Sequence, residues 1–226
     1  MISGQNDKTE AELLALEEYI LEHISPEPPL LKKLYRDAHT HLVRPRMMSG
    51  HHQGRLLALL SKLKSPRNVI EIGTYTGYAT LCLAEGLSEK GVVHTIELND
   101  EMEDFLRRYF DQSEWKEQIR LYFGDALEIL PTLPLEETDI VYIDANKRHY
   151  IEYVKLVLKR LPAGSLIISD NTLWDGKVIE PEAQDEQTVS IRNFNDYLLE
   201  QPELSTVILP LRDGLTLSIK QTDTQQ

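Results

Sequence analysis

The chain has 226 residues, of which 41% are hydrophobic and 27% charged, and its formal net charge is −13. This length and composition are typical of one globular protein with a full core, and the acidic balance argues against nucleic acid and anionic membrane surfaces as partners. No run is long enough to span a membrane and the N-terminus lacks a signal-peptide pattern, so we expect a cytoplasmic protein. The single cysteine, Cys82, excludes an internal disulfide.

Helical patterns open the chain. Residues 9–24, 30–42 and 51–63 place apolar side chains at helical spacing, with a break at Ser25-Pro26 and a loop over 43–50. We therefore expect a single domain over 1–226, with an N-terminal helical cap at 1–64 ahead of an α/β core at 65–226.

A strand, a turn and a helix follow in the sequence NVIEIGTYTG, which occupies residues 68–77. The β-branched run ends in Gly73, where the backbone can turn sharply and a ligand can approach closely. Gly77 opens the helical pattern of residues 78–87, whose N-terminus offers free N–H groups. Tyr75 stands where a dinucleotide fingerprint has its second glycine, so the pattern favours a different nucleotide-like ligand.

Strands and helices then alternate. Further strand patterns end at Glu97, near Gly124-Asp125, at Asp144 and at Asp170-Asn171, with helices over 101–110, up to 130, and over 149–161. A polar segment at 175–188 precedes a helix at 189–200, and two β runs at 205–220 surround Arg212-Asp213-Gly214, a hairpin signal. The alternation predicts a parallel sheet covered by helices on both faces, with an antiparallel hairpin at its edge.

Acidic and amide side chains stand where these strands end, the rim at which α/β proteins bind ligands. Glu97 lies where an acidic side chain accepts hydrogen bonds from ribose hydroxyls. Asp144, Asp170 and Asn171 end adjacent predicted strands and offer the hard oxygen ligands that Mg²⁺ prefers. The alternative for these three is helix capping, for which Asp and Asn are well suited.

Other side chains near this rim each allow two interpretations. Lys147 follows Asp144 closely, and a lysine beside a divalent cation loses its proton more readily and can act as a base, although most lone lysines are solvated charges. Trp174 and Tyr75 could form aromatic walls or belong to the core. The spacing of His39, His41, His51 and His52 fits no standard zinc site.

The motifs carry a family resemblance over nearly the whole chain. VIEIGTYTGYAT, YIDANKRHY and LIISDNTLWDGKV resemble the cofactor loop and the two metal segments of the cation-dependent class I O-methyltransferases of the caffeoyl-CoA and catechol type, particularly bacterial members. The resemblance implies a Rossmann-like class I methyltransferase fold with a seven-stranded, mostly parallel sheet and a C-terminal antiparallel hairpin. It also implies S-adenosylmethionine and Mg²⁺ or another divalent cation as cofactors, a homodimer, and N-terminal helices that help to cover the active site.

The same resemblance implies roles for individual residues. The metal ligands would be Asp144, Asp170 and Asn171, Lys147 would be the base that acts beside Asp144, and Trp174 and Lys147 would contact the substrate. Cofactor contacts would come from Met48, Ser49, Glu71, Gly73, Thr74, Tyr75, Ala79, Glu97, Asp125, Ala126, Asp144 and Asn146. Three positions depart from the family pattern: Asn146 replaces an aspartate, Ala79 replaces a serine, and His51-His52-Gln53 replaces a small-acidic-acidic run before Gly54.

These observations predict methyl transfer from S-adenosylmethionine to one hydroxyl of a catechol-type small molecule. An alternative acceptor is a hydroxylated tRNA nucleoside, which the local basic stretch from Lys32 to Arg46 favours and the net charge opposes. A third hypothesis is a cofactor-binding scaffold without catalysis.

Overall fold

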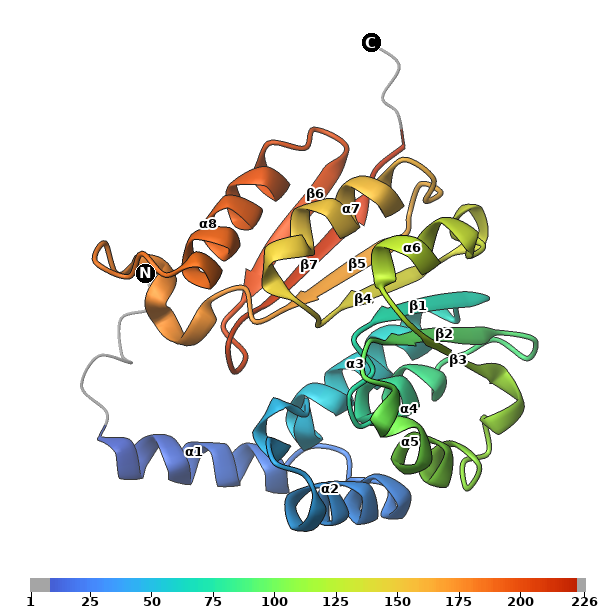
Figure 1. The fold of residues 1–226 in the computed structure, drawn as a ribbon. Helices are drawn as coiled ribbons and strands as arrows, with labels where there is room; N and C mark the ends of the chain where they lie inside the picture. Colours follow the sequence, from blue (N-terminus) through green and yellow to red (C-terminus); the bar gives the residue numbers. More distant parts are fainter. Residues whose placement is uncertain (1–8, 223–226) are drawn as a thin grey trace.

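The computed structural model describes residues 9–222, so residues 1–8 of the predicted helical cap lie outside the described part. Its centre is a seven-stranded sheet with the spatial order β3-β2-β1-β4-β5-β7-β6. The first five strands in this order are parallel, and β7 runs antiparallel to both β5 and β6 (Figure 1). The predicted α/β class, with its parallel sheet and antiparallel edge hairpin, is confirmed.

The strands keep close to the apolar runs that predicted them. Their bounds are β1 Asn68–Ile72, β2 Val92–Glu97, β3 Ile119–Phe123, β4 Ile140–Ile143, β5 Leu166–Asp170, β6 Leu204–Leu209 and β7 Leu215–Lys220. All residues of β4 and β5 are buried, because helices cover both faces of the sheet at its centre. The edge strand β6 is largely exposed.

The helices form two layers, one on each face of the sheet (Figure 1). The α-helices are α1 Glu10–Glu22, α2 Pro29–His41, α3 Gly50–Lys64, α4 Tyr78–Ala84, α5 Glu103–Phe110, α6 Ala126–Ile129, α7 Tyr150–Leu158 and α8 Glu186–Leu199. Short 3-10 turns are η1 Pro45–Met47, η2 Asp100–Met102, η3 Lys116–Gln118, η4 Leu130–Thr132, η5 Leu135–Glu137, η6 Lys147–His149 and η7 Trp174–Ile179. Buried residues of α2 to α5 share one core cluster, and those of α6, α7 and α8 share the other.

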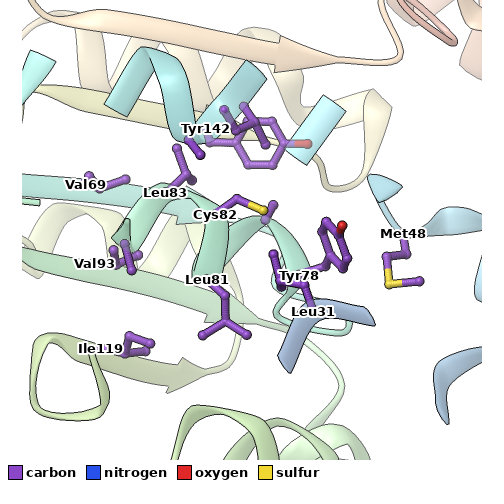
Figure 2. Packing of buried hydrophobic residues seen from close by; sticks show 14 of the residues in the cluster. Leu31, Met48, Val69, Tyr78, Leu81, Cys82, Leu83, Val93, Ile119 and Tyr142 are labelled. Atoms are coloured by element: carbon purple, nitrogen blue, oxygen red, sulfur yellow. The ribbon is translucent and has the colours of Figure 1, made fainter. Parts of the chain in front are cut away.

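Side-chain alternation along the strands explains the two cores. In β1, Val69 belongs to the cluster under α3 and α4, whereas Ile70 and Ile72 belong to the opposite one. Figure 2 shows Val69 with Val93 and Ile119, one from each of three neighbouring strands, beside the side chains of α4. Cys82 of α4 is fully buried among them, and burial raises the pKa of its thiol to about 12.

Several helices end or begin a few residues away from the predicted positions; the helix predicted for 149–161, for example, ends at Leu158. Two of these differences have an evident local cause. The helix predicted for 78–87 stops at Ala84, because the backbone of Gly86 lies against the end of α3, where a Cβ would come within 2.2 Å of the Lys62 nitrogen. The helix predicted for 189–200 begins earlier, at Glu186, because the Asp185 side chain caps it by accepting from the backbone N–H of Thr188 at 3.1 Å.

The parallel strands place the predicted strand-end residues at one rim. β1 pairs with β4, so Ile72 lies beside Ile143, and the Asp144 N–H donates to the Ile72 carbonyl at 2.9 Å. β4 pairs in turn with β5, which ends at Asp170. Asp144 and Asp170 therefore end adjacent strands, as the sequence predicted.

No described helix is long and apolar enough to cross a membrane.

Candidate active site

A cavity of about 660 Å³ opens at the carboxyl ends of the parallel strands. Most of the predicted site residues line it: Ser49, Gly73, Tyr75, Glu97, Asp125, Ala126, Asp144, Asn146, Lys147, Asp170, Asn171 and Trp174. Residues from five strand ends, from the loop before α3 and from the segment after β5 thus meet at one cavity, as the switch of strand order between β1 and β4 requires.

Four predicted cofactor residues do not line the cavity but lie behind its wall. Met48, Glu71, Thr74 and Ala79 are buried, and Met48 and Ala79 belong to the core cluster drawn in Figure 2. Glu71 is fully buried: its Oε2 accepts hydrogen bonds from the hydroxyls of Thr80 and Thr95, while Oε1 has no partner. Burial raises the pKa of Glu71 to about 8.

The turn after β1 forms one part of the cavity wall. Gly73 has a φ of +97°, and a Cβ there would lie 2.0 Å from the carbonyl oxygen of Asp144, so only glycine fits. The next turn residue, Tyr75, has a φ of +47°, and its backbone N–H donates to Glu97 Oε2 at 2.7 Å. The other oxygen of Glu97 accepts from the Asn99 N–H at 2.9 Å, which fixes the carboxylate at the rim.

In another part of the cavity wall, Lys147 is held beside Asp144. Its Nζ lies 2.9 Å from Asp144 Oδ1 and donates to the Tyr150 hydroxyl, also at 2.9 Å. Tyr150 is fully buried, and its hydroxyl lies within hydrogen-bonding distance of the carbonyls of Ile143 and Asp170. The Lys147 side chain is only 10% exposed, so its amine is confined to the wall of the cavity.

Asp170 is the centre of a buried hydrogen-bond network. Its Oδ2 accepts from Gln53 Nε2 at 2.5 Å and from the Tyr142 hydroxyl at 2.8 Å, and its Oδ1 accepts from the Asn171 N–H at 2.7 Å. Tyr142 also contacts Gln53 at 3.1 Å and the hydroxyl of Ser49 at 3.3 Å. The network therefore connects Asp170 to the loop before α3.

The surroundings of Asp170 disfavour its ionised form. Burial, followed by the negative charge of Asp144, raises the pKa of Asp170 to about 6, although the hydrogen bonds from Gln53 and Tyr142 lower it. Asn171 stands next to this pair with a φ of +59°, and its Nδ2 lies 3.4 Å from Asp213 Oδ2. Two neighbouring carboxylates and an amide oxygen are a donor set that a divalent cation would stabilise.

Within residues 9–222, no group of three or more His, Cys, Asp or Glu side chains is arranged to hold a metal. The three residues at the rim, Asp144, Asp170 and Asn171, provide two carboxylates and one amide oxygen, so they are not such a group. The four histidines considered for zinc are dispersed: His39 and His41 contact carbonyls within α2, and His51 Nε2 lies 2.8 Å from the Ser25 carbonyl.

The sequence predicts no site role for several lining residues, namely Arg44, Arg46, Leu98, His149, Tyr153, Gln187, Arg212 and Asp213. In the sequence, Arg44 and Arg46 belong only to a basic stretch, and Arg212 and Asp213 only to a turn signal. A buried polar residue, Gln53, had been noted only as a departure from a family pattern. It is 1% exposed, and its place on the apolar face of α3 with Leu57 was the available signal.

The fold and the rim define a class: a Rossmann-like protein that binds a nucleotide-type ligand beside a pair of acidic strand ends. Comparison with known proteins narrows this class. A family model described as O-methyltransferase matches residues 21–221.

Named relatives agree with this match. A catechol O-methyltransferase from Niastella koreensis is 31% identical over 77% of this chain and 83% of its own length. Caffeoyl-CoA O-methyltransferase 2 from Eucalyptus globulus is 32% identical over 90% of this chain and 87% of its own length. The crystal structure of the O-methyltransferase TomG from Streptomyces achromogenes in complex with SAM has a TM-score of 0.86 and 27% identity, covering 95% of this chain and all of that one.

The chain belongs to the O-methyltransferase family. The resemblance to caffeoyl-CoA and catechol O-methyltransferases and the methyltransferase fold predicted from the sequence are both confirmed.

Proposed function

We propose that this O-methyltransferase transfers the methyl group of S-adenosylmethionine to one hydroxyl of a catechol-type acceptor, with the help of a divalent cation. The observation that carries the proposal is the meeting of Asp144, Lys147, Asp170 and Asn171 at one cavity that Gly73 and Glu97 also line. The names of the relatives and the SAM bound to TomG support it.

Residues of the turn after β1 and of the neighbouring strand ends would hold the cofactor. Gly73 lets the ligand approach the backbone, and Ser49 borders its methionine end. Glu97 accepts hydrogen bonds from the ribose hydroxyls, because each of its oxygens keeps a lone pair beyond its backbone contact. Asp125 and Ala126 border the adenine. Met48, Glu71, Thr74 and Ala79 act behind this surface by supporting it.

Asp144, Asp170 and the side-chain oxygen of Asn171 would hold the cation, which we propose to be Mg²⁺. The fit rests on the buried carboxylate of Asp170 next to Asp144 and on the Asn171 side-chain oxygen, since its Nδ2 is the atom directed to Asp213. A bound divalent cation would stabilise negative charge on the acceptor oxygen and orient both hydroxyls. Gln53 and Tyr142 orient Asp170 for this role.

Lys147 serves as the base. Its Nζ would take the proton from the attacking hydroxyl, and S-adenosylmethionine would supply the methyl group to the acceptor oxygen and leave as S-adenosylhomocysteine. Tyr150 keeps the amine at the cavity wall through its hydrogen bond. Trp174 lies in the segment after β5, has a φ of +48° and lines the cavity. Its side chain forms a wall for the aromatic ring of the acceptor. Rate acceleration comes chiefly from positioning.

A hydroxylated tRNA nucleoside remains a second candidate acceptor, because Arg44 and Arg46 line the cavity and are exposed at its rim. Methyl transfer measured against caffeate, caffeoyl-CoA, a flavonoid catechol and bulk tRNA separates the candidates. A product from a catechol but not from tRNA is expected. A product from tRNA alone, formed at a rate that falls steeply with salt, would overturn the choice of acceptor.

We further propose a cytoplasmic homodimer. Helix α1 exposes Leu13, Leu14 and Tyr19 to 47%, 57% and 57%, an apolar surface that a second copy could cover. Analytical ultracentrifugation should give twice the chain mass of 26.0 kDa, and a monomer at micromolar concentration would contradict this proposal.

A further inference from the structure

The turn between β6 and β7 connects two parts of the cavity that are far apart in the sequence. Arg212 and Asp213 of this turn both line the cavity, and neither has a role in the reaction proposed above. The turn therefore offers a second function besides joining two strands.

The guanidinium of Arg212 holds the loop before α3. Its Nη1 donates to the carbonyls of Met48, at 2.8 Å, and Ser49, and its Nη2 donates to the carbonyl of Arg46 at 3.3 Å. Gly50, which follows this loop, has a φ of +74°, and a Cβ there would be in ordinary van der Waals contact with Nη1, at 3.4 Å. Three carbonyls that converge on one planar group suit the fixed fork of an arginine and not the single ammonium of a lysine.

The backbone of Arg212 is in a conformation that disfavours a side chain. Its φ is +51°, in the left-handed region where glycine is the residue without strain. An arginine at this position has a strained backbone, and such strain is found most often at functional sites.

The same turn also holds the acceptor side of the cavity. The carbonyl of Asp213 accepts from the N–H groups of Leu173 and Trp174 at 2.7 and 3.2 Å, and its Oδ2 lies 3.4 Å from Asn171 Nδ2. The turn is thus anchored on the segment after β5, and the arginine extends from this anchored base to the loop before α3.

We propose that Arg212 is a positioning residue for the cofactor: it holds the carbonyls of Arg46, Met48 and Ser49 in place, so that Ser49 faces the cavity. This inference rests on the proposed function, in which Ser49 borders the methionine end of the cofactor. Removing the guanidinium should release the loop and weaken cofactor binding while leaving the chemical step, which takes place at Asp144 and Lys147, almost unchanged.

The test compares Arg212→Gly, Arg212→Lys and a matched control, Ser65→Gly, with the wild type. Ser65 is an exposed residue at the end of α3 with a φ of +48°, so its replacement also relieves a left-handed backbone, away from the cavity residues. Binding of S-adenosylhomocysteine is measured by calorimetry, KM and kcat by initial rates, and amide hydrogen exchange at residues 46–50 on the protein without ligand.

For Arg212→Gly we expect the dissociation constant and KM for the cofactor to rise about tenfold, which corresponds to about 1.4 kcal/mol. We expect kcat to change less than twofold, exchange at 46–50 to accelerate, and the unfolding midpoint not to fall, because glycine fits the turn. Arg212→Lys should keep most of the binding defect, and Ser65→Gly should bind as the wild type does.

Wild-type affinity in Arg212→Gly, or unchanged exchange at 46–50, would overturn the inference alone. Full recovery in Arg212→Lys would also overturn it, because charge and not the fork would then be responsible. If the wild type itself does not bind S-adenosylhomocysteine, the proposed cofactor site fails and this inference fails with it.

Discussion

Replacing Gln53 with leucine tests whether the buried network around Asp170 is built as described. Gln53 is 1% exposed, and its Nε2 contacts both Asp170 Oδ2 at 2.5 Å and the Tyr142 hydroxyl at 3.1 Å. A hydrogen bond to a charged group contributes about 1.5–3 kcal/mol and one to a neutral group about 1 kcal/mol. Leucine fills a similar volume without donating, so Gln53→Leu should lower the free energy of unfolding by about 3 kcal/mol near pH 7.5.

The loss should depend on pH in a defined direction. Because the pKa of Asp170 is raised to about 6, this carboxyl is mostly protonated at pH 5 in the folded protein. The Gln53 amide then faces a neutral partner, and the deficit of the leucine variant should shrink to about 1–2 kcal/mol.

Urea unfolding of the metal-free protein at both pH values, followed by circular dichroism, measures this deficit. Gln112→Leu, at an exposed glutamine, is the control and should change the free energy by no more than about 0.5 kcal/mol. A deficit for Gln53→Leu that equals the control, or one that grows at pH 5, would refute the network.

Three other substitutions test separate parts of the account. The pKa of Glu71 is about 8 in the folded protein, against its usual 4.5. Between these pH values the folded protein keeps a proton that the unfolded chain releases, so its stability falls as the pH rises. Glu71→Gln should flatten this dependence of the melting temperature on pH, and an unchanged dependence would contradict the assignment. Gly73→Ala places a Cβ 2.0 Å from the Asp144 carbonyl oxygen, so it should abolish calorimetric binding of S-adenosylhomocysteine or prevent folding, and normal binding by a folded variant would contradict the geometry. Lys147→Met should lower kcat by about a hundredfold or more with little change in cofactor affinity; a kcat within threefold of the wild type would remove Lys147 from the role of base.

The sequence predicted the sheet because its central strands are nearly continuous apolar runs. Such runs are typical of strands that helices cover on both faces of the sheet. It also predicted that Asp144 and Asp170 would lie together, since the carboxyl ends of neighbouring parallel strands meet at one rim. These inferences need only strand direction and order, which local patterns and chain connectivity constrain.

The positions of Gln53 and Arg212 could not be predicted in the same way. Gln53 reaches Asp170 from a helix more than a hundred residues earlier, and Arg212 reaches the Met48 carbonyl from the opposite end of the chain. Such contacts depend on side-chain direction in three dimensions, which periodicity does not specify. The limits of short helices such as α4 were missed for a related reason, because the close approach of Gly86 to α3 is a tertiary contact.

The central claim is that Asp144, Asp170 and Asn171 hold a divalent cation that methyl transfer to a catechol requires. The most direct test follows the transfer of label from methyl-labelled S-adenosylmethionine to caffeate or another catechol of the panel before and after EDTA treatment, and again after Mg²⁺ is restored. We predict that turnover falls at least a hundredfold with EDTA and returns with Mg²⁺ in the wild type, and that Asp170→Ala is inactive under all three conditions. Full turnover in EDTA, or an active Asp170→Ala variant, would contradict the claim.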